Sequence, residues 1–158
     1  MALVSDAGTP GISDPAYLIV SQALKNGIPV VPIPGATALI SALVVSGMST
    51  DRFVFEGFLP QKKGRKTKWE SLKSETRTII LYESPHRLPK ALSEINTYLG
   101  NRNIVVAREL TKKFEEVVRG PVQSIITQLG QREPRGEYVL IIEGIERTAS
   151  NKEVCPAS

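Results

Sequence analysis

Residues 3–15 read LVSDAGTPGISDP, a polar loop of mostly small residues between a short apolar run and a helical pattern. Gly8 and Gly11 tolerate positive φ and let the backbone come close to a ligand. In open α/β sheets, ligands bind at loops of this kind, at the carboxyl ends of strands. The loop matches neither the dinucleotide pattern GxGxxG nor the phosphate pattern GxxxxGK[ST], so phosphate binding is not indicated. A ligand loop and a tight structural turn are both compatible with these residues.

Around this loop, strand-like and helix-like patterns alternate through residues 1–50. Two strands are predicted at 2–5 and 28–33, and two helices after Asp14-Pro15 and after Pro34-Gly35, the second ending at Gly47. Two strands do not form a stable open sheet by themselves. We therefore expect residues 1–50 to be the remnant of an N-terminal α/β domain, cut from a longer protein.

A polar segment at residues 49–51 predicts a domain boundary. Beyond it, strands are predicted at 53–58, 78–82, 103–107, 115–119 and 137–142, and helices around 69–72, 88–99 and 122–129. The strand at 115–119 is expected at an edge. This alternation predicts a second α/β domain over residues 51–145 with a largely parallel or mixed sheet. Residues 146–158 are expected to be a disordered tail.

Composition narrows the class of protein. The chain has 158 residues and a net charge of +4, with 20 Lys and Arg against 16 Asp and Glu. Residues 1–50 hold a single basic residue, so the positive charge lies later in the chain, where it mildly favours nucleic acid as a partner. One cysteine, Cys155, and one histidine, His86, exclude an internal disulfide and a nitrogen–sulfur metal cluster. No apolar run is long enough to span a membrane. We expect a cytoplasmic protein with no metal and no membrane partner.

A second loop of small residues, PIPGATA at residues 32–38, leads into the second helix. Small residues at a helix N-terminus leave backbone N–H groups open to an acceptor. Two such loops at neighbouring strand ends predict one ligand cleft, which is a stronger indication than either loop gives separately.

Residues 61–68 read QKKGRKTK and contain five basic residues and no acidic one. Phosphate backbones attract such loops through counterion release. Candidate nucleic-acid contacts are therefore Lys62, Lys63, Arg65 and Lys66. Trp69 follows directly and is compatible with stacking on a base or with a place in the core.

Charged residues also follow two later strands. The stretch YESPHR supplies Glu83, His86 and Arg87, and ARELTKK supplies Arg108, Glu109 and Lys112. These positions are candidates for a cleft at the carboxyl ends of the strands. His86 is a candidate general base, although a capping or surface role fits it as well. A surface ion-pair network is an equally compatible interpretation of the other residues.

Six motifs in order resemble the tetrapyrrole methylase superfamily, and within it the members that methylate small-subunit ribosomal RNA: LVSDAGTPGISDP, PIPGATALISAL, FEGFLPQKKGRK, LYESPHRL, VARELTKKFEEVVRG and GEYVLIIEG. The resemblance implies a two-domain homodimer that binds S-adenosylmethionine between its domains, and an N-terminal truncation of this chain. The residues it implies at the methyl donor are Ala7, Gly8, Thr9, Ile12, Thr37, Ala38, Glu83 and Ala107, with Val139 nearby.

The function implied by the resemblance is methyl transfer to the ribose 2′-hydroxyl of a cytidine in small-subunit ribosomal RNA. Glu109 and Lys112 are then the candidate catalytic residues, and Lys62, Lys63, Arg65, Lys66 and Arg87 the candidate RNA contacts, with no metal needed. Two alternatives stay open: a methyltransferase for a tetrapyrrole or another small molecule, and a non-catalytic RNA-binding fragment. A nicotinamide dehydrogenase is disfavoured because its glycine fingerprint is missing.

Overall fold

The computed structural model describes residues 1–130 and 132–145, so the predicted tail at 146–158, with Cys155, lies outside the described residues. The elements in order are α1 (Tyr17–Lys25), α2 (Ala38–Ser46), β1 (Phe53–Phe58), α3 (Arg65–Leu72), β2 (Thr78–Glu83), the short 3-10 helix η1 (Pro85–Arg87), α4 (Leu88–Leu99), β3 (Asn103–Arg108), β4 (Glu116–Pro121), α5 (Val122–Leu129) and β5 (Tyr138–Ile142). None of these helices is long and apolar enough to cross a membrane.

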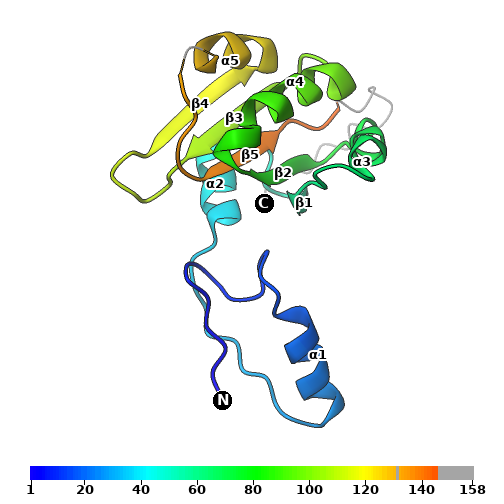
Figure 1. Cartoon of the computed structure of the whole chain (residues 1–158), viewed down its shortest axis with the longest axis vertical. Helices are drawn as coiled ribbons and strands as arrows, with labels where there is room; N and C mark the ends of the chain where they lie inside the picture. The colour runs from blue at the N-terminus through cyan, green and yellow to red at the C-terminus, as the bar shows by residue number, and fades with distance from the viewer. Residues whose placement is uncertain (131, 146–158) are drawn as a thin grey trace, which may run out of the picture.

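The five strands form one mixed sheet in the order β1-β2-β5-β3-β4 (Figure 1). β1 and β2 are parallel, whereas β5 runs antiparallel to both of its neighbours and β4 runs antiparallel to β3. The carboxyl ends of β1, β2 and β3 therefore meet at the same edge as the first residue of β5. The prediction of a mixed α/β sheet is confirmed. As expected, β4 is an edge strand, with a neighbour on one side alone among the described strands.

Helices cover both faces of the sheet, and alternate strand residues pack beneath them. On one face, α3, α4 and α5 cover a cluster that includes Trp69, Ile79, Leu81, Ile95, Ile104, Ile125 and Leu140. On the other face, α2 covers a smaller cluster of Leu39, Ala42, Leu43, Ile80, Val105, Ala107, Val139 and Ile141. Figure 1 shows α4 and α5 above the sheet and α2 below it. Although α2 precedes the boundary predicted at 49–51, it packs on the sheet; the boundary itself stays a prediction.

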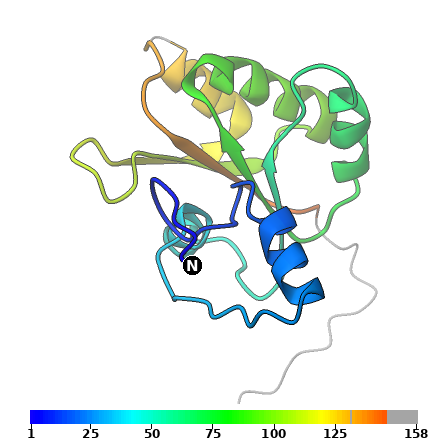
Figure 2. The same ribbon diagram turned by 60° about the horizontal axis from the view of Figure 1, so that its bottom comes forward.

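Residues 1–37, called here the N-terminal region, differ from the sheet. They contain α1 and no strand, so the strands predicted at 2–5 and 28–33 are wrong. Figure 2 shows the stretch after α1 returning to α2 without a strand beside it. Pro29 and Pro32 lack the N–H that a strand ladder needs, and no other described segment pairs with this stretch. Ala16 is the one buried side chain among residues 1–37.

Two element boundaries also differ from the sequence prediction. The helix expected to start at Asp14-Pro15 begins at Tyr17, after a run of turns. The stretch expected to be a basic loop up to Lys68 is already helical from Arg65, following Gly64 at φ +83°. The second predicted helix ends as expected, with Gly47 in the left-handed conformation at φ +75°.

Candidate functional site

The N-terminal region faces the sheet edge at which β1, β2 and β3 end. A cleft of about 470 Å³ lies between them, within the size range of small-ligand pockets. Both parts of the chain contribute to its lining, which consists of Ala7, Gly8, Thr9, Ile12, Ser13, Asp14, Ala36, Thr37, Ala38, Ser41, Phe58, Tyr82, Glu83, Ser84, Pro85, Leu110, Thr111, Lys112, Gly136, Glu137, Tyr138 and Val139. Residues more than 100 positions apart thus share one wall.

The two loops of small residues touch each other at this cleft. Thr9 donates from its backbone N–H and from its hydroxyl to the carbonyl of Ala36, at 3.0 and 3.2 Å. Gly8 adopts φ +73°, and a Cβ placed there would lie 3.2 Å from that same carbonyl. A side chain at Gly8 would therefore be strained and would crowd the contact between the loops. The prediction that both loops line one cleft is confirmed, although no strand precedes either loop.

Tyr82 joins the second loop to the sheet. Its hydroxyl accepts a hydrogen bond of 3.1 Å from the backbone N–H of Leu39, in the first turn of α2. This N–H is one of those that a helix start leaves without an intrahelical partner. Burial raises the pKa of Tyr82, so its hydroxyl stays protonated at neutral pH. The contact fixes Thr37 and Ala38 against the end of β2.

Glu83 closes β2 with a carboxylate that is held between two arginines. The Nε of Arg87 lies 2.8 Å from one oxygen, and the guanidinium of Arg65 lies 3.6 Å from the other. The Ser84 backbone N–H also donates to Glu83, at 2.9 Å. The side chain is 3% exposed, so these partners rather than water hold the carboxyl group in a fixed position in the lining of the cleft.

Arg65 was predicted as an RNA contact, and its position argues against that role. The residue is 4% exposed, and its guanidinium binds Glu94 at 2.6 Å and donates to the carbonyl of Pro60 at 3.1 Å. Trp69 donates from its indole to the same Glu94 at 3.1 Å and is fully buried. Both residues are therefore structural, which also rules out base stacking by Trp69. The prediction for Arg65 failed because its two carboxylate partners lie far away in sequence.

Glu109 and Lys112 form a small network with Glu137. The Glu109 carboxylate accepts from the Glu137 backbone N–H at 2.9 Å, and the Lys112 ammonium lies 2.8 Å from the Glu137 carboxylate and 3.2 Å from that of Glu109. The Glu137 N–H and then Lys112 lower the pKa of Glu109, while Glu137 and Glu109 raise the pKa of Lys112. Both shifts favour the charged forms, so Lys112 presents a cation to the cleft.

Most residues predicted at the donor lie around this cleft. Those lining it are Ala7, Gly8, Thr9, Ile12, Thr37, Ala38 and Glu83, together with Val139 and Lys112. Ala107 does not line it, because it is fully buried beneath α2. His86 lies on η1, is exposed and does not line the cleft. Among the candidate RNA contacts, Lys62, Lys63 and Lys66 are exposed, and the side chain of Arg87 is 24% exposed.

Sequence reasoning missed several residues of the cleft. Phe58, Tyr82 and Tyr138 give it an aromatic wall, and Leu110 and Gly136 complete the far side. The sequence held one signal for Phe58. It ends the strand predicted at 53–58, and the ends of the next two strands were already taken as candidate positions for a cleft. Gly136 carried no such signal, because its role depends on the Glu109 side chain, which would lie 2.6 Å from a Cβ at that position.

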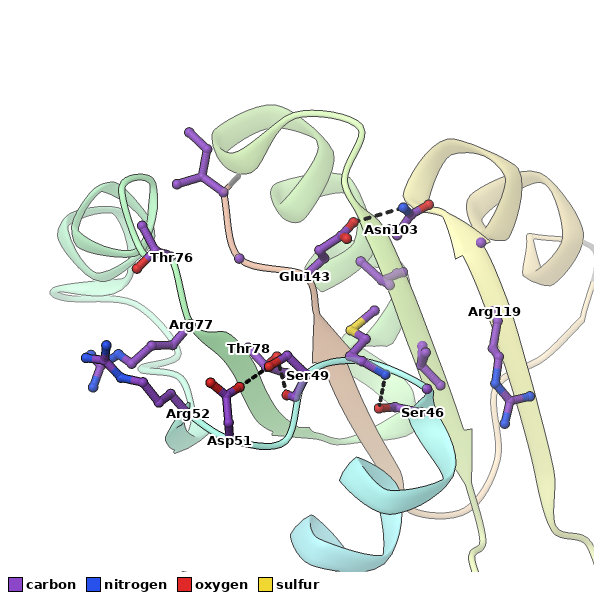
Figure 3. Close-up of a pocket in the computed structure, with 17 residues that line it drawn as sticks. Ser46, Ser49, Asp51, Arg52, Thr76, Arg77, Thr78, Asn103, Arg119 and Glu143 are labelled. Carbon is purple, nitrogen blue, oxygen red and sulfur yellow. Dashed lines mark hydrogen bonds between the residues drawn. The ribbon is translucent and has the colours of Figure 1, made fainter. Parts of the chain in front are cut away.

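A larger cavity of about 790 Å³ lies at the opposite edge of the sheet, beside the segment that joins α2 to β1 (Figure 3). None of the predicted site residues line it. Its polar groups bind one another: Asn103 donates to Glu143 at 2.8 Å, and the hydroxyl of Thr78 donates to the carbonyl of Ser49 at 2.8 Å. We therefore take the smaller cleft as the candidate site.

Comparison with known proteins finds matches over most of the chain. The family model of the tetrapyrrole (corrin/porphyrin) methylases matches residues 1–126. Proteins named ribosomal RNA small subunit methyltransferase I are similar over most of the chain. That of Synechocystis is 54% identical over 91% of this chain and 52% of its own length, and that of Bacillus subtilis is 48% identical over 98% of this chain and 52% of its own length. The chain thus spans about half the length of these relatives.

Solved structures show the same fold. A cobalt precorrin-4 methyltransferase of cobalamin biosynthesis superposes with a TM-score of 0.64 at 17% identity, over 86% of this chain and 61% of that protein. A diphthine synthase gives a TM-score of 0.65 at 13% identity, over 87% of this chain and 57% of that protein. The match of the family model over most of the sequence, with the fold and the cleft, leads to one conclusion. This chain belongs to the tetrapyrrole methylase family.

Proposed function

We propose that this chain binds S-adenosylmethionine in the cleft and acts in methylation of small-subunit ribosomal RNA. The observation that carries the proposal is the meeting of the two loops at Thr9 and Ala36, which brings most of the predicted donor residues, from both parts of the chain, around one space. The names of the relatives at about half identity support the substrate class. A uroporphyrin-III C-methyltransferase from Thermus thermophilus of the same fold was solved with S-adenosyl homocysteine, at a TM-score of 0.57.

The residues of the cleft fit such a donor. Gly8 has no side chain where a Cβ would crowd the second loop, so backbone of both loops lies open to the space. Ala7, Ala38 and Ile12 offer small and apolar surface, while Thr9 and Thr37 offer polar groups. Together, these residues would hold the nucleoside and amino-acid parts of the donor. The bound donor would supply a methyl group on a sulfonium, which is strongly electrophilic.

The chain's own task is then to position the acceptor against the donor. Lys112 lines the cleft as a cation, and Glu109 and Glu137 hold it in place. Its raised pKa makes it a hydrogen-bond donor rather than a base, and the lowered pKa of Glu109 makes that carboxylate a weak base. We therefore assign Lys112 to orienting the acceptor, with Glu109 positioning Lys112. The ribose 2′-hydroxyl of a cytidine as acceptor rests on the family resemblance.

The exposed lysines favour RNA over a tetrapyrrole as the substrate. Lys62 and Lys63 precede α3, and the side chain of Lys66 is 73% exposed. These lysines lie outside the lining of the cleft, where they suit the phosphates of a ligand that extends beyond it, whereas a macrocycle enclosed in the cleft would not reach them. With Arg65 occupied in the core, the proposed contacts are these lysines and Arg87. Cytoplasmic location and a homodimer stay predictions from the resemblance and composition.

Calorimetric titration of S-adenosylmethionine into the chain tests the proposal. We expect saturable binding that Gly8→Ala weakens at least tenfold. Gly27→Ala is the matched control, because Gly27 also adopts positive φ, at +69°, but nothing lies within 4 Å of a Cβ there. Both variants meet a similar backbone strain of about 1–2 kcal/mol, and only Gly8 contacts the second loop. The control should bind as the wild type does.

A second titration with ribosomal RNA separates the alternatives. Salt-sensitive RNA binding that Lys62→Ala weakens supports an RNA substrate over a tetrapyrrole. RNA binding without any binding of S-adenosylmethionine would contradict the proposed function and favour the non-catalytic RNA-binding fragment.

A further inference from the structure

Phe58 is an exposed aromatic residue at the rim of the cleft. It is the last residue of β1 and is 53% exposed, although both of its neighbours, Gly57 and Leu59, are buried. A large apolar side chain left half in water at a concave site offers contact surface to a ligand. Its position at the cleft therefore calls for a structural explanation.

A β-bulge directs Phe58 toward the cleft side of the sheet. Phe55 pairs with Ile80 and Gly57 pairs with Leu81, so the register shifts by one residue between them. Phe58 consequently lies beside Tyr82, on the face that α2 covers. Without the extra residue, strict alternation would place Phe58 on the opposite face from Phe55. Bulges commonly redirect a side chain next to a functional site.

Neighbouring side chains hold the Phe58 ring in place. Tyr82 packs edge-on against it with ring centroids 5.7 Å apart, and Tyr82 is itself bonded to the start of α2. The Arg87 guanidinium lies over the Phe58 ring, 5.7 Å from its centroid. The Nε of Arg87 is fixed at 2.8 Å from the Glu83 carboxylate. The site thus presents a supported, half-exposed aromatic ring with a cation over one of its faces, so that a base would stack on the other face.

An aromatic ring with a neighbouring cation suits the base and the phosphate of a single nucleotide. Proteins recognise unstacked RNA bases by stacking them on aromatic rings, and every base offers a flat face for that contact. Enzymes that act on a base extrude it from its neighbours, and a nucleotide held in this way at the cleft would need a new stacking partner for its base. An arginine beside the ring is suited to the phosphate of the same nucleotide.

We propose that Phe58 is the stacking platform for the nucleobase of the acceptor nucleotide, with Arg87 beside it for the phosphate. The assignment rests on the proposed function and adds to it the residue that holds the base. The role of Phe58 is to bind and orient the acceptor next to the cleft.

The test measures binding of short single-stranded RNA to the whole chain by fluorescence anisotropy. Phe58→Leu keeps apolar volume and removes the ring, and it should weaken RNA binding about 5- to 100-fold, as expected for loss of one stacked base. Phe58→Trp keeps a stacking surface and should bind within about threefold of the wild type. The loss in Phe58→Leu should persist at raised salt, because stacking is not ionic, whereas the loss in Lys62→Ala should shrink.

Phe114 provides a matched control within the same molecule. It is 62% exposed and carries a Lys113 ammonium 5.7 Å from its ring centroid, but it does not line the cleft. Phe114→Leu should leave RNA binding within twofold of the wild type. An equal loss in Phe114→Leu and Phe58→Leu would overturn the proposal, since exposed rings would then bind RNA without regard to position.

Calorimetry of S-adenosylmethionine with Phe58→Leu completes the design. RNA binding that is weakened by a clearly larger factor than donor binding supports the platform. Weakened donor binding with unchanged RNA binding would overturn it and assign the ring to the donor. Failure of the wild type to bind S-adenosylmethionine would contradict the proposed function, while the RNA comparison of Phe58 and Phe114 would still decide the role of the ring.

Discussion

Residues 28–33 and β5 are two apolar stretches of similar length with opposite outcomes. β5 lies between β2 and β3, pairs with both, and buries all five of its residues. Residues 28–33 read IPVVPI, form no strand, and leave Val31 76% and Ile33 79% exposed. An apolar run becomes a strand only where neighbours accept its backbone hydrogen bonds and cover its side chains. Local composition gives no information about such neighbours.

The same contrast holds between the N-terminal region and the part of the chain that forms the sheet. Among residues 1–130 and 132–145, every ion pair joins residues between Glu56 and Glu137. The N-terminal region has one buried side chain, yet it supplies part of the wall of the cleft. Ligand loops are often less tightly packed than the scaffold that presents the rest of a site.

The largest expected difference concerns packing. Leu140→Ala removes a fully buried side chain from β5, and we expect it to lower the free energy of unfolding by about 3 kcal/mol. Leu24→Ala in α1 changes a side chain that is 60% exposed and should cost less than about 0.5 kcal/mol. Urea unfolding followed by circular dichroism measures both. Equal losses would show that α1 is packed as firmly as the sheet and would remove the contrast between the two regions.

A smaller difference separates two adjacent residues of the basic stretch. Arg65→Ala leaves the buried Glu83 carboxylate and the partly buried Glu94 carboxylate short of a partner and should destabilise the fold by about 2 kcal/mol. Lys66→Ala should leave stability within about 0.5 kcal/mol and weaken RNA binding instead. Thermal unfolding and RNA titration of both variants test whether Arg65 stabilises the fold and Lys66 binds RNA. Destabilisation by Lys66→Ala, or its absence in Arg65→Ala, would reverse the assignment.

The smallest expected effect is a dependence of stability on pH. Hydrogen bonds from the Arg77 side chain and backbone lower the pKa of Glu75 from 4.5 to about 2. Because the folded-state pKa lies below the unfolded one, the pair stabilises the fold above about pH 4.5, and this contribution is lost as the pH falls toward 2. Since the Arg77 side chain is 41% exposed, we expect less than about 1 kcal/mol.

Comparing Glu75→Gln with the wild type between pH 7 and pH 3 measures that contribution. The variant should be slightly less stable at pH 7, and the two curves should approach each other as the pH falls. Glu70→Gln is the control, because Glu70 forms an exposed ion pair with Lys66 at the longer distance of 3.7 Å. A difference between wild type and Glu75→Gln that grows toward acid pH would contradict the assignment.

Much of the sheet could be predicted from the sequence because its local patterns agree with its packing. The five strands beyond residue 51 and the helix bearing Leu88, Leu92, Ile95 and Leu99 occur as expected. The rule that ligands bind at strand ends likewise predicted Glu83 and Lys112, and both line the cleft. Ala107 was expected at the donor but does not line the cleft, because α2 packs over it.

Beyond residue 51 the sequence by itself determined which segments alternate, and in both parts of the chain it determined which loops are rich in small residues, since turn chemistry and hydrophobic periodicity are local properties. Only the tertiary structure decided the fates of Arg65 and Lys66, because the partner Glu94 is 29 residues from Arg65 in the chain. The same holds for Phe58, whose direction depends on a register shift against β2. Partners distant in sequence thus decide whether a given side chain stabilises the fold or remains free to bind.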